Sequence, residues 1–110
     1  MNQLSGSWLA QRFGIDPLRV DRLRRAGELH AVRNGTGEWN YPSWQFEADG
    51  RTKPAVLRLL AVAHEERIAG LELEELLDRR VGLLGGTTVR DLLLNGGEER
   101  ALAELRAARR

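Results

Sequence analysis

The chain has 110 residues, of which 42% are hydrophobic and 30% charged, so it holds one domain or two very small ones with enough apolar residues for a core. Its formal net charge is +1, and cysteine is absent, which excludes a disulfide framework and cysteine-ligated zinc. No apolar run approaches the roughly 20 residues of a membrane-spanning helix, and a signal-peptide pattern is lacking, so we expect a cytoplasmic protein with no membrane partner.

Two short helices joined by a sharp corner are predicted first. Ser7 is the expected N-cap of a helix over residues 8–13, because its hydroxyl can accept a free backbone N–H, and a glycine ends that helix. Asp16 then caps a second helix over residues 17–26, with Pro17 at the first position, where its missing N–H costs nothing. About three residues separate the two helices, which leaves room only for a tight turn.

A β-hairpin is predicted next. Residues 28–32 alternate polar and apolar side chains, as a half-buried strand does. The sequence Asn34-Gly35-Thr36-Gly37 favours a hairpin turn, because Asn and Gly accept positive φ angles. Residues 38–41 can return as the partner strand, and Pro42 ends it. Helix, corner, helix and hairpin is the element order of a small winged helix-turn-helix.

The second half of the chain predicts helices only. Apolar residues recur at helical spacing, glycines interrupt the pattern, and Thr88 with Asp91 is typical of a capping box with the shorter acid. The first of the expected helices begins at Pro54, and the next contains Leu71, Leu73, Leu76 and Leu77 and ends before Gly82. The last two cover residues 89–94 and 98–109.

The expected fold class is therefore mainly α. A winged helix-turn-helix DNA-binding domain with a small β-hairpin is expected over residues 1–46, and a polar linker over 47–53. An all-helical region of about three to four helices, for dimerisation or partner binding, is expected over residues 54–110.

Basic residues gather on the second predicted helix. Residues 1–53 carry eight Lys and Arg against six acids, whereas residues 54–110 carry nine against ten. Between Arg19 and Arg25, four arginines accompany one acid, Asp21. A compact basic patch on a nearly neutral protein indicates a local binding surface for a polyanion.

The helical periodicity divides this helix into two faces. Val20 and Leu23 are expected to face the core together with Ile15 and Ala26. The second helix of a helix-turn-helix lies in the major groove, and arginine suits bidentate contact with guanine or phosphate. The residues predicted to bind DNA are Ser7, Pro17, Leu18, Arg19, Arg22, Arg24 at the flank of the helix, Arg25, and Arg33 and Asn34 on the wing. The alternative is that these arginines form a solvated face with Asp21 and Glu28.

Residues 4–46 resemble the helix-turn-helix of the MerR and excisionase families. The matching features are Gly14, Asp16-Pro17, the step Arg25-Ala-Gly27-Glu-Leu29 and the segment from Arg33 to Trp39. The resemblance implies an arginine-rich recognition helix, a small wing and binding to double-stranded DNA.

The remainder of the chain resembles a second group. The matching features are the segment Tyr41–Phe46, the helices after it and the motif from Leu84 to Gly97. They resemble the C-terminal domain of Xre/MbcA/ParS-type antitoxins and the helical tail of related winged-helix DNA-binding proteins. This resemblance implies that the C-terminal half dimerises and, in an antitoxin, contacts a toxin enzyme.

Other conspicuous residues are given structural interpretations. His30 and His64 are isolated, so we expect both at the surface. We expect Trp44 and Phe46 to join the hairpin to the helical half. Aromatic side chains are expected in the core, namely Trp8, Trp39, Tyr41, Trp44 and Phe46. An acidic cluster is expected on a solvated helix face: Glu72, Glu74, Glu75 and Asp78. In an antitoxin, this face or the C-terminal helix is the candidate toxin contact.

These observations together predict a sequence-specific double-stranded DNA-binding protein, a small transcriptional regulator that acts as a homodimer and associates with the nucleoid. The alternative is an antitoxin whose C-terminal half neutralises a toxin while its N-terminal half regulates its own gene. A third hypothesis is an adaptor whose winged unit binds protein. The sequence contains no nucleophile–base pair, phosphate loop or metal-ligand pattern, so we expect no enzyme activity, no metal and no cofactor.

Overall fold

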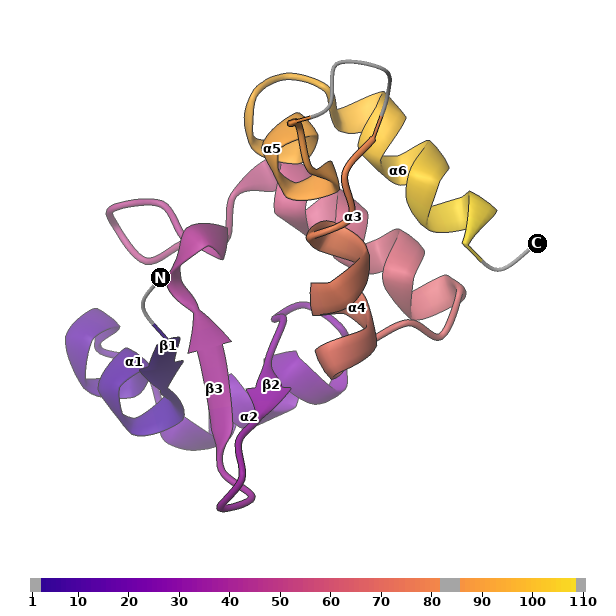
Figure 1. Ribbon diagram of the computed structural model, residues 1–110. Helices are drawn as coiled ribbons and strands as arrows, with labels where there is room; N and C mark the ends of the chain where they lie inside the picture. The colour runs from indigo at the N-terminus through magenta and orange to yellow at the C-terminus, as the bar shows by residue number, and fades with distance from the viewer. Residues whose placement is uncertain (1–2, 82–85, 109–110) are drawn as a thin grey trace.

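The computed structural model describes residues 3–81 and 86–108. The protein is mainly helical, as expected from the sequence (Figure 1). Its small antiparallel sheet has three strands, where a two-stranded hairpin was expected. In chain order the elements are β1 (Gln3–Ser5), α1 (Gly6–Phe13), α2 (Pro17–Arg25), β2 (Val32–Arg33), β3 (Trp39–Pro42), the short 3₁₀ helix η1 (Ser43–Gln45), α3 (Pro54–Glu65), α4 (Gly70–Leu77), α5 (Val89–Leu94) and α6 (Glu98–Ala107). Among the described helices, none combines the length and hydrophobicity needed to cross a membrane.

The start of α1 differs from the prediction. Ser5, not Ser7, is the N-cap: its hydroxyl accepts a hydrogen bond from the Trp8 N–H at 3.0 Å. Ser5 is the last residue of β1 and pairs with Asn40 of β3, so its backbone is already extended, as an N-cap requires. Ser7 therefore lies exposed in the first turn of α1.

The start of α2 agrees with the prediction. The Asp16 carboxylate accepts a hydrogen bond from the Leu18 N–H at 2.9 Å, and Pro17 occupies the first turn. Val20 is 2% exposed and belongs to the core. Ala26 was expected in the core but is exposed, because it follows α2 as the C-cap, where the chain turns away.

The sheet has the order β1-β3-β2, with all pairs antiparallel. The hairpin turn after β2 is confirmed: the Asn34 N–H donates to the Glu38 carbonyl at 2.9 Å. The predicted strand over residues 28–32 is largely wrong, since only Val32 and Arg33 pair with β3. The Glu28 N–H closes the end of α2, and a buried glutamine side chain bonds the backbone of His30, so this segment has other hydrogen-bond partners.

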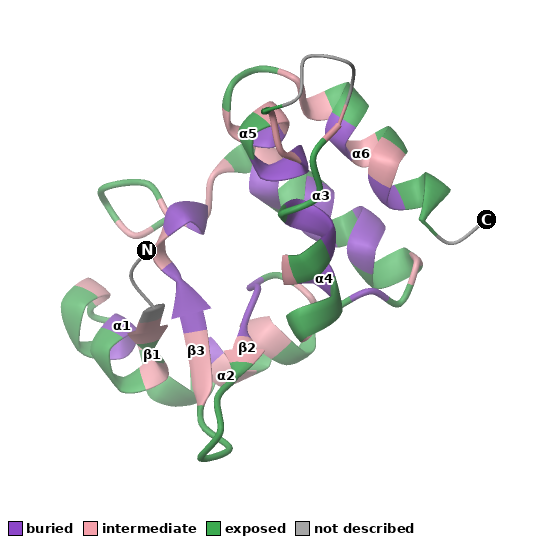
Figure 2. Cartoon of the chain, in the orientation of Figure 1, coloured by how far each residue is buried: buried purple, intermediate pink, exposed green. Residues whose placement is uncertain are grey.

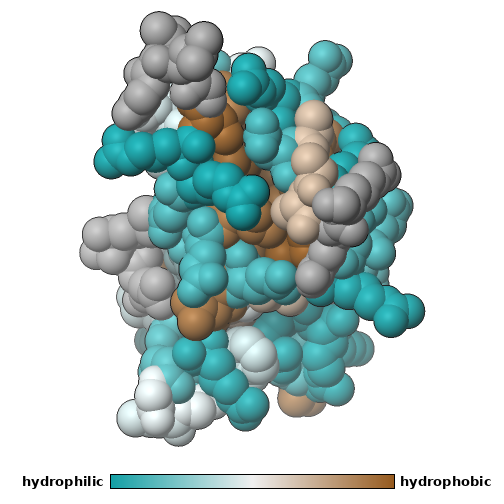
Figure 3. Space-filling model, turned by 45° about the vertical axis from the view of Figure 1, so that its right-hand side comes forward, coloured by the Kyte–Doolittle hydropathy of each residue, from teal (hydrophilic) through white to brown (hydrophobic). Residues whose placement is uncertain are grey.

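Two hydrophobic clusters form the core (Figure 2). The smaller cluster joins α1, α2 and the sheet through Leu9, Ala10, Val20, Leu29, Ala31 and Tyr41. The larger cluster joins α3 to α6, and Trp44 of η1 belongs to it, whereas Phe46 packs against the smaller one. Trp8 is 45% exposed, so the expectation of a core position for it was wrong. On the face in Figure 3, hydrophobic side chains gather mainly over the C-terminal helices.

Several helix ends in the second half carry clear signals. Thr88 and Asp91 form the predicted capping box at the start of α5. Gly70 was expected to interrupt the helical pattern but is the first residue of α4. The last helix was predicted to reach residue 109, which lies outside the described residues. Leu84 and Gly85, which begin the motif shared with the antitoxins, also lie outside them.

The segment 47–53 folds into a turn closed by hydrogen bonds from Glu47 to Arg51 (2.7 Å) and from Lys53 to Gln45 (2.9 Å). Gly50 has a φ of 91°, and a Cβ there would lie 2.3 Å from a ring carbon of Phe13. This turn therefore packs tightly against α1, and only glycine fits at its tip.

Candidate nucleic-acid interface

The exposed face of α2 carries Leu18, Arg19, Arg22 and Arg25. Leu18 is 68% exposed, an unusual position for a large apolar side chain. Arg19 and Arg22 lie about one helical turn apart, and within the described part of the chain neither guanidinium has a hydrogen bond or an ion pair. Their donors are consequently available to a ligand.

Asp21 organises the other two arginines of this helix. Both Arg24 and Arg25 bond its carboxylate. Hydrogen bonds from Arg24 and then from Arg25 hold the pKa of Asp21 below its ordinary value. The single acid of α2 thus pairs with the two arginines at the end of the helix, and not with Arg19 or Arg22.

Arg24 faces the hairpin rather than solvent. Its side chain is only 18% exposed, and its guanidinium carbon lies 4.2 Å from the centre of the Trp39 ring. Arg33 approaches the same ring at 5.1 Å, and its Nε donates to the Gly37 carbonyl at 2.9 Å. The Arg24 contact fixes the hairpin against α2, and the Arg33 contact lies within the hairpin. Of the predicted DNA-binding arginines, Arg24 is therefore placed as a support and Arg19, Arg22, Arg25 and Arg33 remain exposed.

The hairpin projects away from α3, α5 and α6, and its tip is exposed (Figures 1 and 2). Asn34 shapes this tip, because its side-chain oxygen accepts hydrogen bonds from the N–H groups of Thr36 (2.9 Å) and Glu38 (3.0 Å). The remaining predicted residues, Ser7 and Pro17, are exposed and line one shallow depression beside Glu38. The fold thus brings the starts of α1 and α2 close to the hairpin.

A buried polar junction links this region to the C-terminal helices. His30 was expected at the surface but is 3% exposed, with Nε2 2.7 Å from a carboxylate oxygen of Glu74 on α4. The other Glu74 oxygen accepts from Arg90 of α5 at 2.9 Å, and Arg90 also donates to Asp78 at 2.5 Å. Glu74 therefore does not lie on a solvated face, since α4 packs beside β2 and the preceding loop. His64, by contrast, is exposed as predicted.

Two further side chains complete the junction. The Gln45 side chain accepts from the His30 N–H at 2.9 Å and donates to the His30 carbonyl at 2.8 Å. The Trp44 ring lies 5.9 Å from the His30 ring and 5.2 Å from the Arg90 guanidinium carbon. The sequence did not predict that Arg90 would be part of a buried junction, because an arginine in a short helix ordinarily faces water. Its partners Asp78 and Glu74 are also 12 and 16 residues away in the sequence.

The chemistry available at the α2 surface is hydrogen bonding and charge attraction. It offers cationic donors, one exposed apolar side chain and a projecting hairpin. Within residues 3–81 and 86–108, no group of three or more His, Cys, Asp or Glu residues could hold a metal ion.

Comparison with known proteins places the fold but not the family. No family model matches the chain, and no curated protein matches it. Among solved structures, the chain is similar to the NMR structure of Rv2175c, with a TM-score of 0.77 over 99% of this chain and 82% of that one. The two sequences are 18% identical, so the likeness concerns the fold alone.

Proposed function

We propose that this chain is a sequence-specific double-stranded DNA-binding protein, a small transcriptional regulator that acts as a dimer, with residues 3–46 serving as a winged helix-turn-helix. The observation that carries the proposal is the pair Arg19 and Arg22, exposed and without protein partners among the described residues. They stand on a helix whose start is fixed by Asp16 and Pro17. A rigid helix with uncommitted guanidinium groups is suited to DNA recognition.

In this proposal α2 enters the major groove with its N-terminal half leading. Arg19 and Arg22 reach base edges, where arginine pairs with the two acceptors of guanine. Leu18, between them and the helix start, suits contact with a thymine methyl group. Arg25 reaches a phosphate, and Arg33 places the hairpin, as the wing, on the backbone or in the minor groove.

Arg24 acts as a positioning residue. Its contact with Trp39 and its bond to Asp21 hold the hairpin at a fixed distance from α2. Replacing Arg24 is therefore expected to change the spacing between wing and recognition helix rather than to remove a DNA contact.

A dimer follows from the small size of the surface. One protomer offers few base contacts, so useful affinity favours two half-sites, about 34 Å or one helical turn apart. If each protomer neutralises about four phosphates, log affinity falls against log salt with a slope near −3.6 per protomer.

The direct test compares Arg22→Ala with Arg106→Ala, a matched exposed arginine at the far end of the chain on α6. Fluorescence anisotropy with a duplex selected by the wild-type protein measures the affinity. We expect Arg22→Ala to lose about 1–3 kcal/mol and to relax base preference, with Arg106→Ala close to wild type. Equal affinities for the two variants, at unchanged stability, would contradict the proposal.

A further inference from the structure

Two asparagines of the chain are each followed by glycine: Asn34-Gly35 at the tip of the hairpin and Asn95-Gly96 after α5. All four residues are exposed. An asparagine before glycine is chemically labile, because the nitrogen of the next peptide can attack the side-chain carbonyl and glycine has no side chain to obstruct the ring that forms. Both pairs share this chemistry, so their surroundings decide which of them reacts faster.

Three donors surround the side-chain oxygen of Asn34. Its Oδ1 accepts hydrogen bonds from the Thr36 N–H at 2.9 Å, from the Thr36 hydroxyl at 2.6 Å and from the Glu38 N–H at 3.0 Å. The bond to the Thr36 N–H closes a ring around the Gly35 peptide, as in an Asx turn. The Asn34 carboxamide is therefore folded back toward the Gly35 nitrogen.

Gly35 is free to take part in a reaction. Among the described residues its N–H donates to no acceptor. Apart from its chain neighbours, no atom lies within 4 Å of the position that a Cβ of Gly35 would occupy. A five-membered ring that includes the Gly35 nitrogen consequently meets no packed side chain.

The side chain of Asn95 lacks comparable donors. The Asn95 N–H bonds the Asp91 carbonyl at 3.0 Å, but within residues 3–81 and 86–108 no hydrogen bond reaches its side chain. Donors aimed at an oxygen on which negative charge develops lower the barrier to acyl chemistry, because they bind the charged intermediate more strongly than the neutral carbonyl. Only the first of the two Asn-Gly pairs has such donors in the described part of the chain.

We propose that Asn34 is a site of self-catalysed deamidation at the hairpin tip. The Gly35 nitrogen loses its proton to water and attacks Asn34 Cγ, and the negative charge that forms on Oδ1 is stabilised by Thr36 and Glu38. The Cγ–Nδ2 bond then breaks, and ammonia leaves after taking up a proton, which gives a cyclic imide. Water opens either C–N bond of the imide ring, and the product at position 34 is aspartate or isoaspartate.

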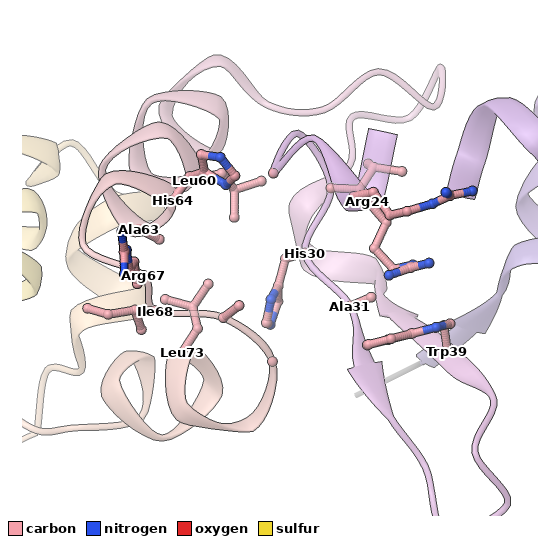
Figure 4. Close-up of a pocket in the computed structure, with 15 residues that line it drawn as sticks. Arg24, His30, Ala31, Trp39, Leu60, Ala63, His64, Arg67, Ile68 and Leu73 are labelled. Atoms are coloured by element: carbon pink, nitrogen blue, oxygen red, sulfur yellow. The ribbon is translucent and has the colours of Figure 1, made fainter. Parts of the chain in front are cut away.

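Either product changes the charge of the hairpin. It adds one negative charge next to Arg33, and isoaspartate also adds one carbon to the main chain within the turn closed by Asn34 and Glu38. The hairpin is held on α2 by Arg24, which lies over the Trp39 ring (Figure 4). The reaction does not depend on the proposed function, but its consequence rests on it: the added charge faces the DNA phosphates and weakens binding.

The test measures the deamidation rates of both asparagines in the full chain by peptide mapping with mass spectrometry, near neutral pH. The ratio of the Asn34 rate to the Asn95 rate is compared between the folded protein and the protein in concentrated urea, where only the local sequence acts. We expect the ratio to be at least threefold larger in the folded protein. An equal or smaller ratio in the folded protein would overturn the proposal.

Variants of Thr36 test the donors themselves. Thr36→Val removes the hydroxyl but keeps the shape of the side chain and the N–H, so the Asn34 rate is expected to fall at least twofold. Thr36→Ser keeps a hydroxyl and should react like the wild type. The Asn95 rate in the same molecules should not change, and it serves as the internal control. An unchanged Asn34 rate in Thr36→Val would overturn the role assigned to the donors.

A binding measurement separates this proposal from the DNA-binding one. Asn34→Asp is expected to lose at least threefold in affinity for a duplex selected by the wild type, and Asn95→Asp, the matched control, to bind like the wild type. Equal affinities of the two variants would overturn the stated consequence. If Asn34 reacts faster in the folded protein but no duplex binds, the DNA-binding proposal fails and the modification site stands. If a duplex binds and folding leaves the rate ratio unchanged, the modification proposal fails alone.

Discussion

Arg22 on α2 and Arg90 on α5 differ in what surrounds them. Arg22 is exposed and has no partner among the described residues, whereas Arg90 is 8% exposed, donates to Glu74 and Asp78 and lies over the Trp44 ring. A guanidinium whose donors are already used by the protein stabilises the fold, and one whose donors are unused can bind a ligand. Burial and partners, not residue type, thus separate an arginine that the fold uses from one whose donors remain available.

The N-terminal region, which carries Arg22, and the C-terminal helices, which carry Arg90, also differ in the size of their hydrophobic cores. The helices α3 to α6 share the larger hydrophobic cluster, whereas α1, α2 and the sheet share a smaller one. A small core gives little stability by itself. The N-terminal region therefore gains stability from its contacts with the C-terminal helices, such as the His30–Glu74–Arg90 junction.

The largest expected effect is at Arg90. Arg90→Ala leaves the mostly buried Glu74 without its cation, so we expect a loss of about 3–5 kcal/mol in the free energy of unfolding. Urea denaturation measures this, with the exposed Arg79→Ala as control, which should stay within about 0.5 kcal/mol of wild type. A loss below about 1 kcal/mol in Arg90→Ala would show that the junction does not stabilise the fold.

A glycine series tests how tightly the turn over residues 47–53 packs against α1. Gly50→Ala combines a positive φ with a steric clash against Phe13, so we expect a loss above about 2 kcal/mol. Gly37 has a φ of 86° with open space around it, so Gly37→Ala should lose about 1–2 kcal/mol. Gly35→Ala meets neither obstacle and should change little. Thermal unfolding of the three variants measures the loss of stability in each. Equal losses in Gly50→Ala and Gly37→Ala would mean that the packing of Gly50 against Phe13 is unimportant.

Arg67→Gly is expected to stabilise the protein. Glycine adopts the left-handed backbone without strain, so we expect a gain of about 1 kcal/mol in the free energy of unfolding, measured with urea. A destabilised variant would show that the Arg67 side chain contributes more to the fold than its backbone strain takes away.

The smallest effect on stability is expected from replacing Asp21, because its ion pairs with Arg24 and Arg25 lie at the surface. Its pKa lies below the ordinary value of 3.8 because of Arg24 and Arg25. Its stabilising contribution is therefore present above about pH 4 and is lost as the pH falls through the lowered pKa. Asp21→Asn should lower Tm slightly at pH 7, and this difference should vanish toward pH 2. A difference that persists at pH 2 would indicate another role for Asp21.

Much of the local structure could be predicted from the sequence. Asp16-Pro17 at the start of α2, the turn at Asn34 and the capping box of Thr88 and Asp91 each depend on residues within a few positions of one another. The strand β1 could not be predicted, because its three residues are extended only through pairing with β3, more than 30 residues later. Ser5 consequently became the cap where Ser7 was expected.

The candidate site was predictable to a similar extent. The helical period identified the exposed positions of Arg19, Arg22 and Arg25. It did not show that Arg24 would lie over Trp39, 15 residues away, because that contact depends on how the hairpin packs. Nor could it show the bond between His30 and Glu74, which are separated by 44 residues. Long-range contacts of polar side chains leave no periodic signal in the sequence.

The antitoxin hypothesis stays a prediction. It requires a protein partner for the C-terminal half, and its measurement is co-purification of the chain with the product of a neighbouring gene. A dimer of this chain alone on a sizing column, with no such complex on co-expression, would count against it.

DNA recognition by α2 is tested most directly by selection of bound duplexes from a random pool, with the wild-type protein and with Arg22→Ala in parallel. We predict a palindromic consensus with half-sites about one helical turn apart, whose base preference is relaxed in Arg22→Ala at unchanged stability. Recovery of no enriched sequence by the wild type, or of the same consensus by both proteins, would contradict the claim that α2 recognises DNA.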